Sequence, residues 1–125
     1  MTNKVLQTLF VYGSLKRGFY NNCVLKDSNF VKEDTITAPF TMISFGSFPA
    51  LVQDNYGSWR SIKGEIFELT DKDIVKAVES LEGFPSFYKR KSIVTNSGVL
   101  CDVYVLNENS NYTSEDIVDS GEWTE

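Results

Sequence analysis

The distribution of β-forming residues is the feature that most constrains the fold of this chain. Short segments rich in Val, Ile, Phe, Tyr and Thr alternate with glycine, proline and asparagine, and only one segment has clear helical periodicity. Because hairpins link most of these segments, they predict an α+β fold with a mixed sheet, curled into a small β-barrel of about six strands. The predicted strands are Val5–Tyr12, two or three pieces between Phe30 and Val52, Ile62–Leu69, Tyr88–Thr95 and Val99–Leu106.

One main helix is predicted to begin after Thr70. Thr70 or Asp71 is expected to cap its first N–H groups. Gly83 is expected to end it, and Pro85 cannot continue it. A short flanking helical turn is predicted at Asn21–Leu25. The apolar residues of the main helix that share one face are Ile74, Ala77, Val78 and Leu81.

Composition favours one ordinary globular domain over residues 1–125. Hydrophobic residues make up 42% and charged residues 23%, which is near the globular average and unlike a disordered chain. A net charge of −5 without a concentrated basic cluster argues against a nucleic-acid partner. There is no signal-peptide pattern and no apolar run near the ~20 residues of a membrane span. Two cysteines are too few for a disulfide scaffold, so we expect a cytoplasmic protein without a membrane partner.

The chain contains no histidine. Histidine-dependent triads and the usual zinc sites are therefore excluded. If the chain is an enzyme of hydrolysis or group transfer, its general base must be a carboxylate, Lys, Tyr or Cys.

The loop at the end of the first predicted strand is a candidate anion site. It consists of Tyr12, Gly13, Ser14 and Leu15. Glycine allows a sharp turn and close approach of a ligand, and successive N–H groups in such a turn form a concave anion site. The alternative is an ordinary exit from a strand.

Glu82 is the candidate proton carrier. It stands at the C-terminal end of the predicted helix, where the helix dipole and partial burial would both raise the pKa of a carboxylate toward neutrality. Such a group accepts a proton and returns it. Glu79, one turn earlier, is the local competitor, and a solvated helix-end acid is the alternative interpretation.

Two further groups of residues have the composition of a binding site. Tyr88 and Arg90 are predicted to point to the same face of a strand, where one would orient a ligand and the other hold an anion. Gly64 within a strand indicates a close approach or a bulge, and Glu65 beside it could face a polar cavity.

In combination, these motifs resemble the γ-glutamylcyclotransferase superfamily, and in particular its small γ-glutamylamine branch. The similarity runs in order along almost the whole chain. It is carried by Phe10–Gly18, Phe48–Val52, Lys63–Phe67, Glu82–Gly83 with Tyr88 and Arg90, and Ser120–Trp123.

The resemblance implies a small barrel with flanking helices around one cavity. It implies that the backbone of Tyr12–Leu15 binds a γ-glutamyl group and that Glu82 is the catalytic glutamate. It also implies that neither a metal nor an organic cofactor is needed. The chain departs from the family pattern at Asn22, where many members have histidine, and at Val78-Glu79, where members often have Leu-Asp.

The expected reaction is cyclisation of a γ-glutamyl amine or γ-glutamyl amino acid to 5-oxoproline, with release of a free amine and with Glu82 as base and then acid. The partner would be this small molecule; the leaving amine and the oligomeric state are left open. One alternative is a protein of the same fold that binds a metabolite without catalysis. Another is an interaction protein using its acidic surface and Trp123, for which a filled cavity near Glu82 would be the sign.

Overall fold

The computed structural model describes residues 4–53, 60–84, 86–106 and 112–124. The sequence Asn55-Tyr56-Gly57-Ser58, whose composition is typical of a turn, lies outside them. The strands are β1 (Gln7–Val11), β2 (Asn29–Ala38), β3 (Phe40–Ser44), β4 (Pro49–Gln53), β5 (Arg60–Leu69), β6 (Tyr88–Val94) and β7 (Leu100–Leu106). The helices are α1 (Lys72–Glu82) and the 3-10 turns η1 (Asn22–Leu25) and η2 (Ser114–Asp116).

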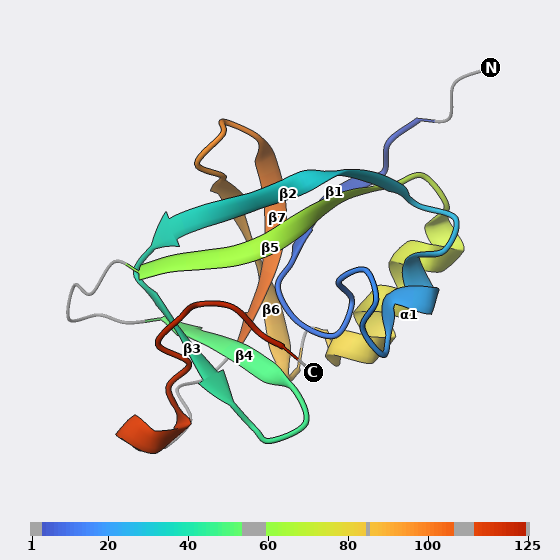
Figure 1. The fold of residues 1–125 in the computed structure, drawn as a ribbon. Coiled ribbons are helices and arrows are strands. Elements are labelled where there is room, and N and C mark those ends of the chain that lie inside the picture. The colour runs from blue at the N-terminus through green and yellow to red at the C-terminus, as the bar shows by residue number, and fades with distance from the viewer. Residues whose placement is uncertain (1–3, 54–59, 85, 107–111, 125) are drawn as a thin grey trace.

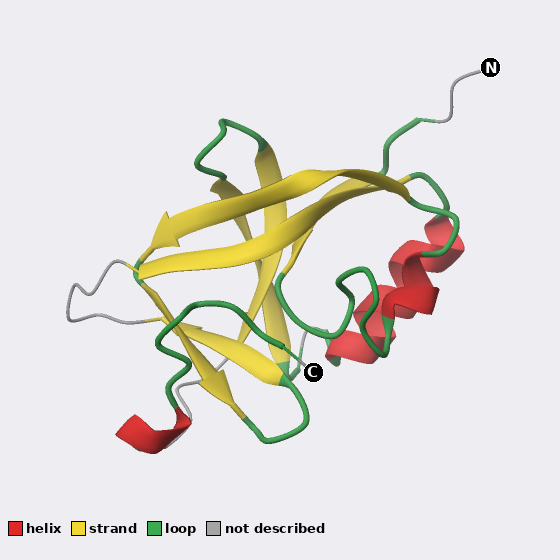
Figure 2. Ribbon diagram, in the orientation of Figure 1, coloured by secondary structure: helices red, strands yellow, loops and turns green. Residues whose placement is uncertain are grey.

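The main sheet is mixed and has β1 at its centre. Its order is β2-β5-β1-β7-β6, and β3 pairs with β4 in a separate two-stranded sheet (Figures 1 and 2). β1 pairs antiparallel with β5, where Leu9 lies opposite Phe67. It pairs parallel with β7, where Leu9 lies opposite Asp102. Two distant parts of the sequence therefore meet on the first strand.

Strand β1 is buried on both faces. Leu9 and Val11 belong to one apolar cluster, which also contains Val78 of α1. Phe10 and Tyr12 belong to a second cluster on the opposite face. Alternate residues of a strand point to opposite sides, so the continuous apolar run of β1 fills two cores at once.

The C-terminal segment packs across the β3–β4 hairpin (Figure 1). The Val118 N–H donates to the Met42 carbonyl at 2.9 Å, and the Lys63 N–H donates to the Gly121 carbonyl at 2.8 Å. Trp123 follows and is only 8% exposed within the second cluster. The C-terminal segment is thus part of the core.

The predicted α+β class, the mixed sheet, the main helix and the short flanking helix are confirmed. The described strands pair in two sheets, so their hydrogen bonds form no single closed ring.

The predicted apolar helix face is only partly right, because Val78 is buried whereas Ala77 and Leu81 are exposed. The absence of a disulfide scaffold fits two free cysteines in a chain where both would be expected to be at least partly buried; Cys101 is buried, whereas Cys23 is exposed. Among the described helices, none is both long and apolar enough to cross a bilayer.

Gly64→Ala is expected to destabilise the fold. A Cβ at position 64 would overlap the Val11 carbonyl oxygen and lie 2.5 Å from a ring carbon of Phe10, at the point where β5 crosses β1. Overpacking of this kind costs about 1–3 kcal/mol, which urea unfolding would measure. Ser61→Ala, at an exposed position of the same strand, is the control and should change the free energy of unfolding by less than about 0.5 kcal/mol. Equal stability of the two variants would contradict this account of Gly64.

Candidate active site

Helix α1 ends directly after Glu82, and capping interactions define both of its ends. The Asp71 carboxylate caps its N-terminus by accepting from the Asp73 N–H at 2.8 Å. At the other end Gly83 is left-handed, with φ of 62°, and the Phe84 N–H donates to the Glu79 carbonyl at 2.9 Å. This closing pattern suits glycine because a left-handed residue with a side chain is strained. The last helical residue is therefore held in a fixed direction.

Glu82 borders a cavity of about 770 Å³. The cavity is also lined by the loop that leaves β1, by the β3–β4 turn, by the start of β6 and by the C-terminal segment. Every predicted site residue contributes to this lining: Tyr12, Gly13, Ser14, Leu15, Glu82 and Tyr88. The structure thus brings together two motifs separated by 66 residues or more of sequence.

The carboxylate of Glu82 is tuned by its surroundings. Burial raises its pKa from 4.5 to about 7, because the charged form loses hydration among apolar neighbours. Burial is the cause of this shift, whereas the sequence had also suggested the helix dipole. Close to neutral pH, both protonation states of such a group are populated, which suits a carrier of protons.

Two tyrosine hydroxyls near Glu82 are fixed by the backbone. The Tyr12 hydroxyl donates to the Tyr104 carbonyl at 2.7 Å and accepts from the Leu51 N–H at 3.3 Å. The Tyr88 hydroxyl donates to the Pro49 carbonyl at 3.1 Å. Burial raises the pKa of both tyrosines well above the ordinary value; Tyr88 and then Glu82 add to the shift of Tyr12, and Glu82 adds to that of Tyr88. Both remain protonated at neutral pH and shape the cavity rather than accept protons.

The loop after β1 offers hydrogen-bond donors. Within the described part of the chain, the backbone N–H groups of Gly13, Ser14 and Leu15 have no protein acceptor. A buried or half-buried N–H without an acceptor is costly unless a ligand or water satisfies it. Three successive donors on a cavity wall are therefore suited to an anionic group.

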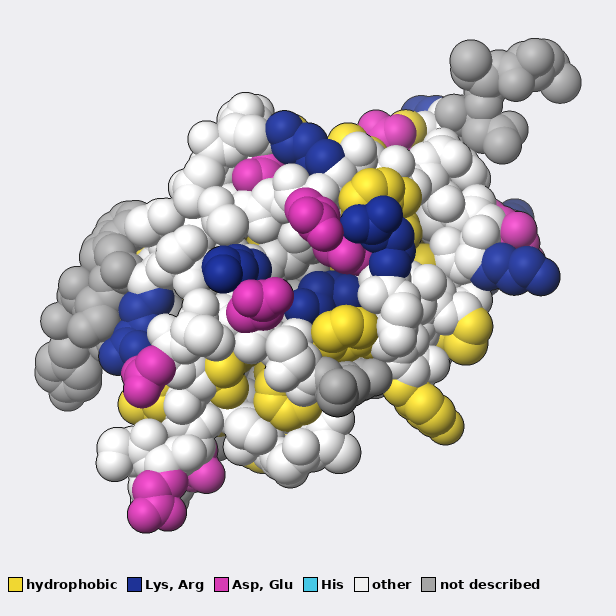
Figure 3. All heavy atoms as spheres, viewed as in Figure 1, with side chains coloured by type: hydrophobic (Ala, Val, Ile, Leu, Met, Phe, Trp, Pro, Cys, Tyr) yellow, Lys and Arg dark blue, Asp and Glu magenta, His cyan; other side chains and the backbone are white. Residues whose placement is uncertain are grey.

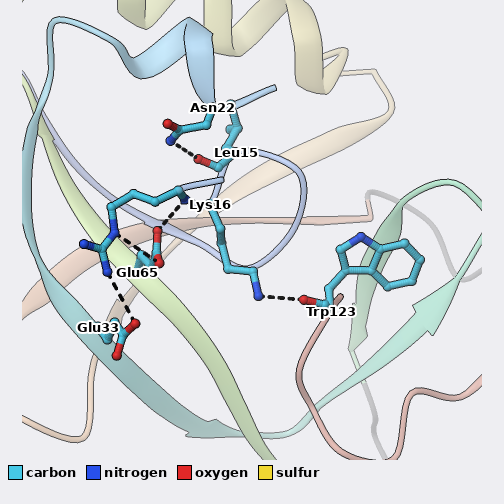
Figure 4. Close-up of polar contacts among 7 residues, drawn as sticks. Leu15, Lys16, Asn22, Glu33, Glu65 and Trp123 are labelled. Atoms are coloured by element: carbon cyan, nitrogen blue, oxygen red, sulfur yellow. Dashed lines mark hydrogen bonds and ion pairs between the residues drawn. The ribbon is translucent and has the colours of Figure 1, made fainter. Parts of the chain in front are cut away.

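The loop is held from behind by polar contacts (Figure 4). The buried Glu65 carboxylate accepts from the Arg17 N–H at 2.7 Å and contacts its guanidinium at 3.4 Å. Asn22, at the position where many relatives were expected to have histidine, donates to the Leu15 carbonyl at 2.8 Å. Lys16 Nζ donates to the Trp123 carbonyl at 2.7 Å. These bonds tie the loop to β5, to η1 and to the C-terminal segment.

The structure separates the remaining candidates from this cavity. Arg90 lies outside its lining and pairs with Glu79 at 3.4 Å, with its guanidinium over the Phe84 ring. Glu65 borders a second, smaller cavity of about 490 Å³ behind the loop, as its strand position suggested. Lining residues that the sequence analysis did not assign to the site include Tyr20, Phe48 and Tyr104. No local signal marks them, because distant strands and turns bring them there.

Charges elsewhere do not form a second recognisable site. In the described residues, no group of three His, Cys, Asp or Glu side chains is arranged to hold a metal ion. On the face seen in Figure 3, basic and acidic side chains are intermingled instead of forming a patch of one sign. Electrostatic recognition of a phosphate backbone has no such surface to use on this face.

Together, the fold and the site define a small α+β protein in which one half-buried carboxylate shares a cavity with a glycine turn. The chain belongs to the gamma-glutamyl cyclotransferase, AIG2-like family, whose model matches residues 9–125. Family membership supports γ-glutamylcyclotransferase-type activity in general.

Similar proteins come from bacteria, archaea and mammals. A protein of Methanocaldococcus jannaschii, provisionally named a gamma-glutamylcyclotransferase, is 35% identical over 74% of this chain and 77% of its own. A Vibrio cholerae protein with the same provisional name is 29% identical over 92% and 93%. The gammaglutamylaminecyclotransferase of Rattus norvegicus is 29% identical over 68% of this chain and 60% of its own. The crystal structure of a mouse AIG2-like protein superposes with a TM-score of 0.75 at 24% identity, covering 97% of this chain and 90% of its own, which supports the fold.

The raised pKa of Glu82 predicts a pH dependence of stability. Between pH 4.5 and about 7 the folded protein holds a proton that the unfolded chain releases, so the free energy of unfolding falls as pH rises through this window. The loss is about 2–3 kcal/mol. Urea unfolding should show this slope in wild type and in Glu79→Gln, and its disappearance in Glu82→Gln. Parallel curves for wild type and Glu82→Gln would contradict the burial of this carboxylate.

Proposed function

We propose that this protein cyclises a γ-glutamyl compound to 5-oxoproline and releases a free amine. The observation that carries the proposal is the shared cavity of Glu82 and the Gly13–Leu15 backbone. One side supplies a carboxylate with a pKa of about 7, and the other supplies three backbone N–H groups for which the described residues provide no acceptor. The reaction needs both, because it moves a proton and must hold a carboxylate-bearing substrate in a folded shape.

Substrate folding is the task of the loop. In our proposal the N–H groups of Gly13, Ser14 and Leu15 bind the α-carboxylate of the γ-glutamyl group. The chain of the substrate then bends until its α-amino nitrogen lies about 3–3.5 Å from its own γ-carbonyl carbon. Tyr12 and Tyr88 restrict this bend, since their hydroxyls are already bonded to the backbone.

Glu82 moves the proton. It accepts a proton from the α-amino group as the nitrogen attacks the γ-carbonyl carbon and the lactam C–N bond forms. It then delivers that proton to the departing nitrogen as the original amide C–N bond breaks, which leaves 5-oxoproline and a neutral amine. One group thus serves as base and then as acid, and proton transfers of this kind contribute ~10²–10⁴-fold in rate.

The open cavity also bears on the alternatives. A protein acting only through its surface and its Trp123 segment was expected to have a filled cavity near Glu82. Instead, Glu82 faces about 770 Å³ of space, and Trp123 forms part of the wall. These features favour a small-molecule site at this position. The cytoplasmic location expected from the free thiols belongs to the same proposal.

Glu82→Gln should nearly abolish turnover. The amide is similar in shape but cannot carry the proton, so we expect a fall in kcat of about 10²–10⁴-fold with a folded protein. Release of 5-oxoproline from a panel of γ-glutamyl amines measures the effect. Glu79→Gln is the matched control, since Glu79 lies one turn away and pairs with Arg90 outside the cavity. Wild-type turnover by Glu82→Gln would refute the proposed role.

The same panel separates catalysis from mere binding. Calorimetry would detect a γ-glutamyl ligand that binds wild-type protein. If such a ligand binds tightly and no compound yields 5-oxoproline, the protein is a metabolite-binding member of the family and the catalytic proposal fails.

Gly13→Ala should weaken use of the substrate. A Cβ at position 13 would lie 2.9 Å from Cγ of Pro49, so the loop or the β3–β4 turn must shift. Misplacement by about 1 Å costs up to about 10²-fold in kcat/KM. Gly98→Ala is the control; unlike Gly13, Gly98 has a positive φ of 96°, and it lies in the β6–β7 turn with open space around it. Equal kinetic effects of the two substitutions would argue against a substrate role for the loop.

A further inference from the structure

Exposed aromatic side chains gather at the mouth of the cavity. Phe48 and Phe87 line it and are 38% and 45% exposed. Phe45 packs behind them, with ring centroids 5.2 Å from Phe48 and 6.3 Å from Phe87. Phe87 in turn packs edge-on against Tyr88 at 4.8 Å. We refer to Phe45, Phe48 and Phe87 as the aromatic rim. The aromatic rim extends the apolar wall of the cavity outward from Tyr88.

The rings come from two separate parts of the chain. Phe45 and Phe48 flank the turn between β3 and β4, whereas Phe87 lies between α1 and β6. Contiguous exposed apolar surface on a small protein usually serves contact with a ligand or a partner. Because two of these rings also line the cavity, the rim belongs to the same site as Glu82.

The cavity has no basic side chain to balance a second anion. The lining contains no lysine or arginine, and its one charged side chain among the described residues is Glu82. The twelve Lys and Arg residues of the chain all fall within the described ranges, because residues 1–3, 54–59, 85, 107–111 and 125 include none. A carboxylate beside the scissile amide, as in a γ-glutamyl amino acid, would therefore lose water near Glu82 without gaining a cationic side chain.

We propose that the amine released by this site carries an uncharged hydrocarbon or aromatic group, which packs on Phe48 and Phe87. This deepens the proposed function and rests on it. The α-carboxylate of the substrate uses the backbone donors of the loop, and the leaving group points outward along the rim. The substrate class is thus γ-glutamyl alkylamines and arylalkylamines, in preference to amines that carry a carboxylate.

The test compares kcat/KM for γ-glutamylbenzylamine, γ-glutamylbutylamine, ε-(γ-glutamyl)lysine and γ-glutamylalanine. We expect the benzylamine compound to exceed γ-glutamylalanine by at least about tenfold, as one well-placed apolar group commonly discriminates. Phe48→Ala and Phe87→Ala should each reduce this ratio severalfold. Phe30→Ala is the matched control, because Phe30 is 37% exposed but lies outside the cavity, and it should leave the ratio unchanged.

Binding to Glu82→Gln protein makes the result independent of turnover. By calorimetry, the benzylamine compound should bind Glu82→Gln protein more tightly than γ-glutamylalanine does. Adding Phe87→Ala to the Glu82→Gln protein should reduce the ratio of the two Kd values. Equal affinities, or a gap that survives both rim substitutions, would overturn the proposed substrate class. If the benzylamine compound binds more tightly but wild-type protein releases no 5-oxoproline from any compound, the proposed reaction is refuted. The preference of the aromatic rim for an apolar group is then still supported.

Discussion

The double burial of strand β1 is the constraint on which the rest of the structure depends. Its alternating residues fill two apolar clusters, so a slip by one residue would exchange side chains of different size between two packed cores. The end of the strand is therefore fixed, and with it the start of the Tyr12–Leu15 loop. Helix α1 packs on one of these clusters through Val78, which sets the position of its last residue, Glu82. The two halves of the site are thus aligned by the core, in which Leu15 of the loop and Val78 of the helix belong to the same cluster.

Polar contacts add to the core packing in fixing the position of the loop after β1. Glu65 is opposite Val11 in the sheet, yet its buried carboxylate turns to the loop and accepts from the Arg17 N–H. A buried carboxylate left without partners would cost several kcal/mol, so this bond is coupled to the folded position of the loop. The Tyr12 and Tyr88 hydroxyls likewise hold their side chains in the cavity wall by hydrogen bonds to backbone carbonyls. Such preorganisation matters because a site that must order its own groups loses binding energy to do so.

Local sequence patterns were sufficient for the elements and for part of the site. Asp71 and Gly83 mark the ends of α1 through capping chemistry that needs no tertiary information. Glu82 and the glycine turn carry equally local signals. Phe48 and Tyr104 carry none, because their presence in the cavity depends on pairing between distant strands. The grouping of strands into two sheets was hidden for the same reason, as was the exposure of Leu81, which borders the cavity instead of packing in the core.

The parallel pairing of β1 with β7 joins residues more than ninety positions apart, as between Leu9 and Asp102. A pairing of such long range closes a large loop, and the entropy cost of closing that loop must be offset by the contacts it makes. During synthesis, the glycine turn and the glutamate would leave the ribosome well before the strand that completes their surroundings. Until then the carboxylate would remain hydrated and ionise as an ordinary acid. Its chemical tuning is therefore acquired only when the last walls of the cavity close, which makes it a late product of folding and not a property of the local motif.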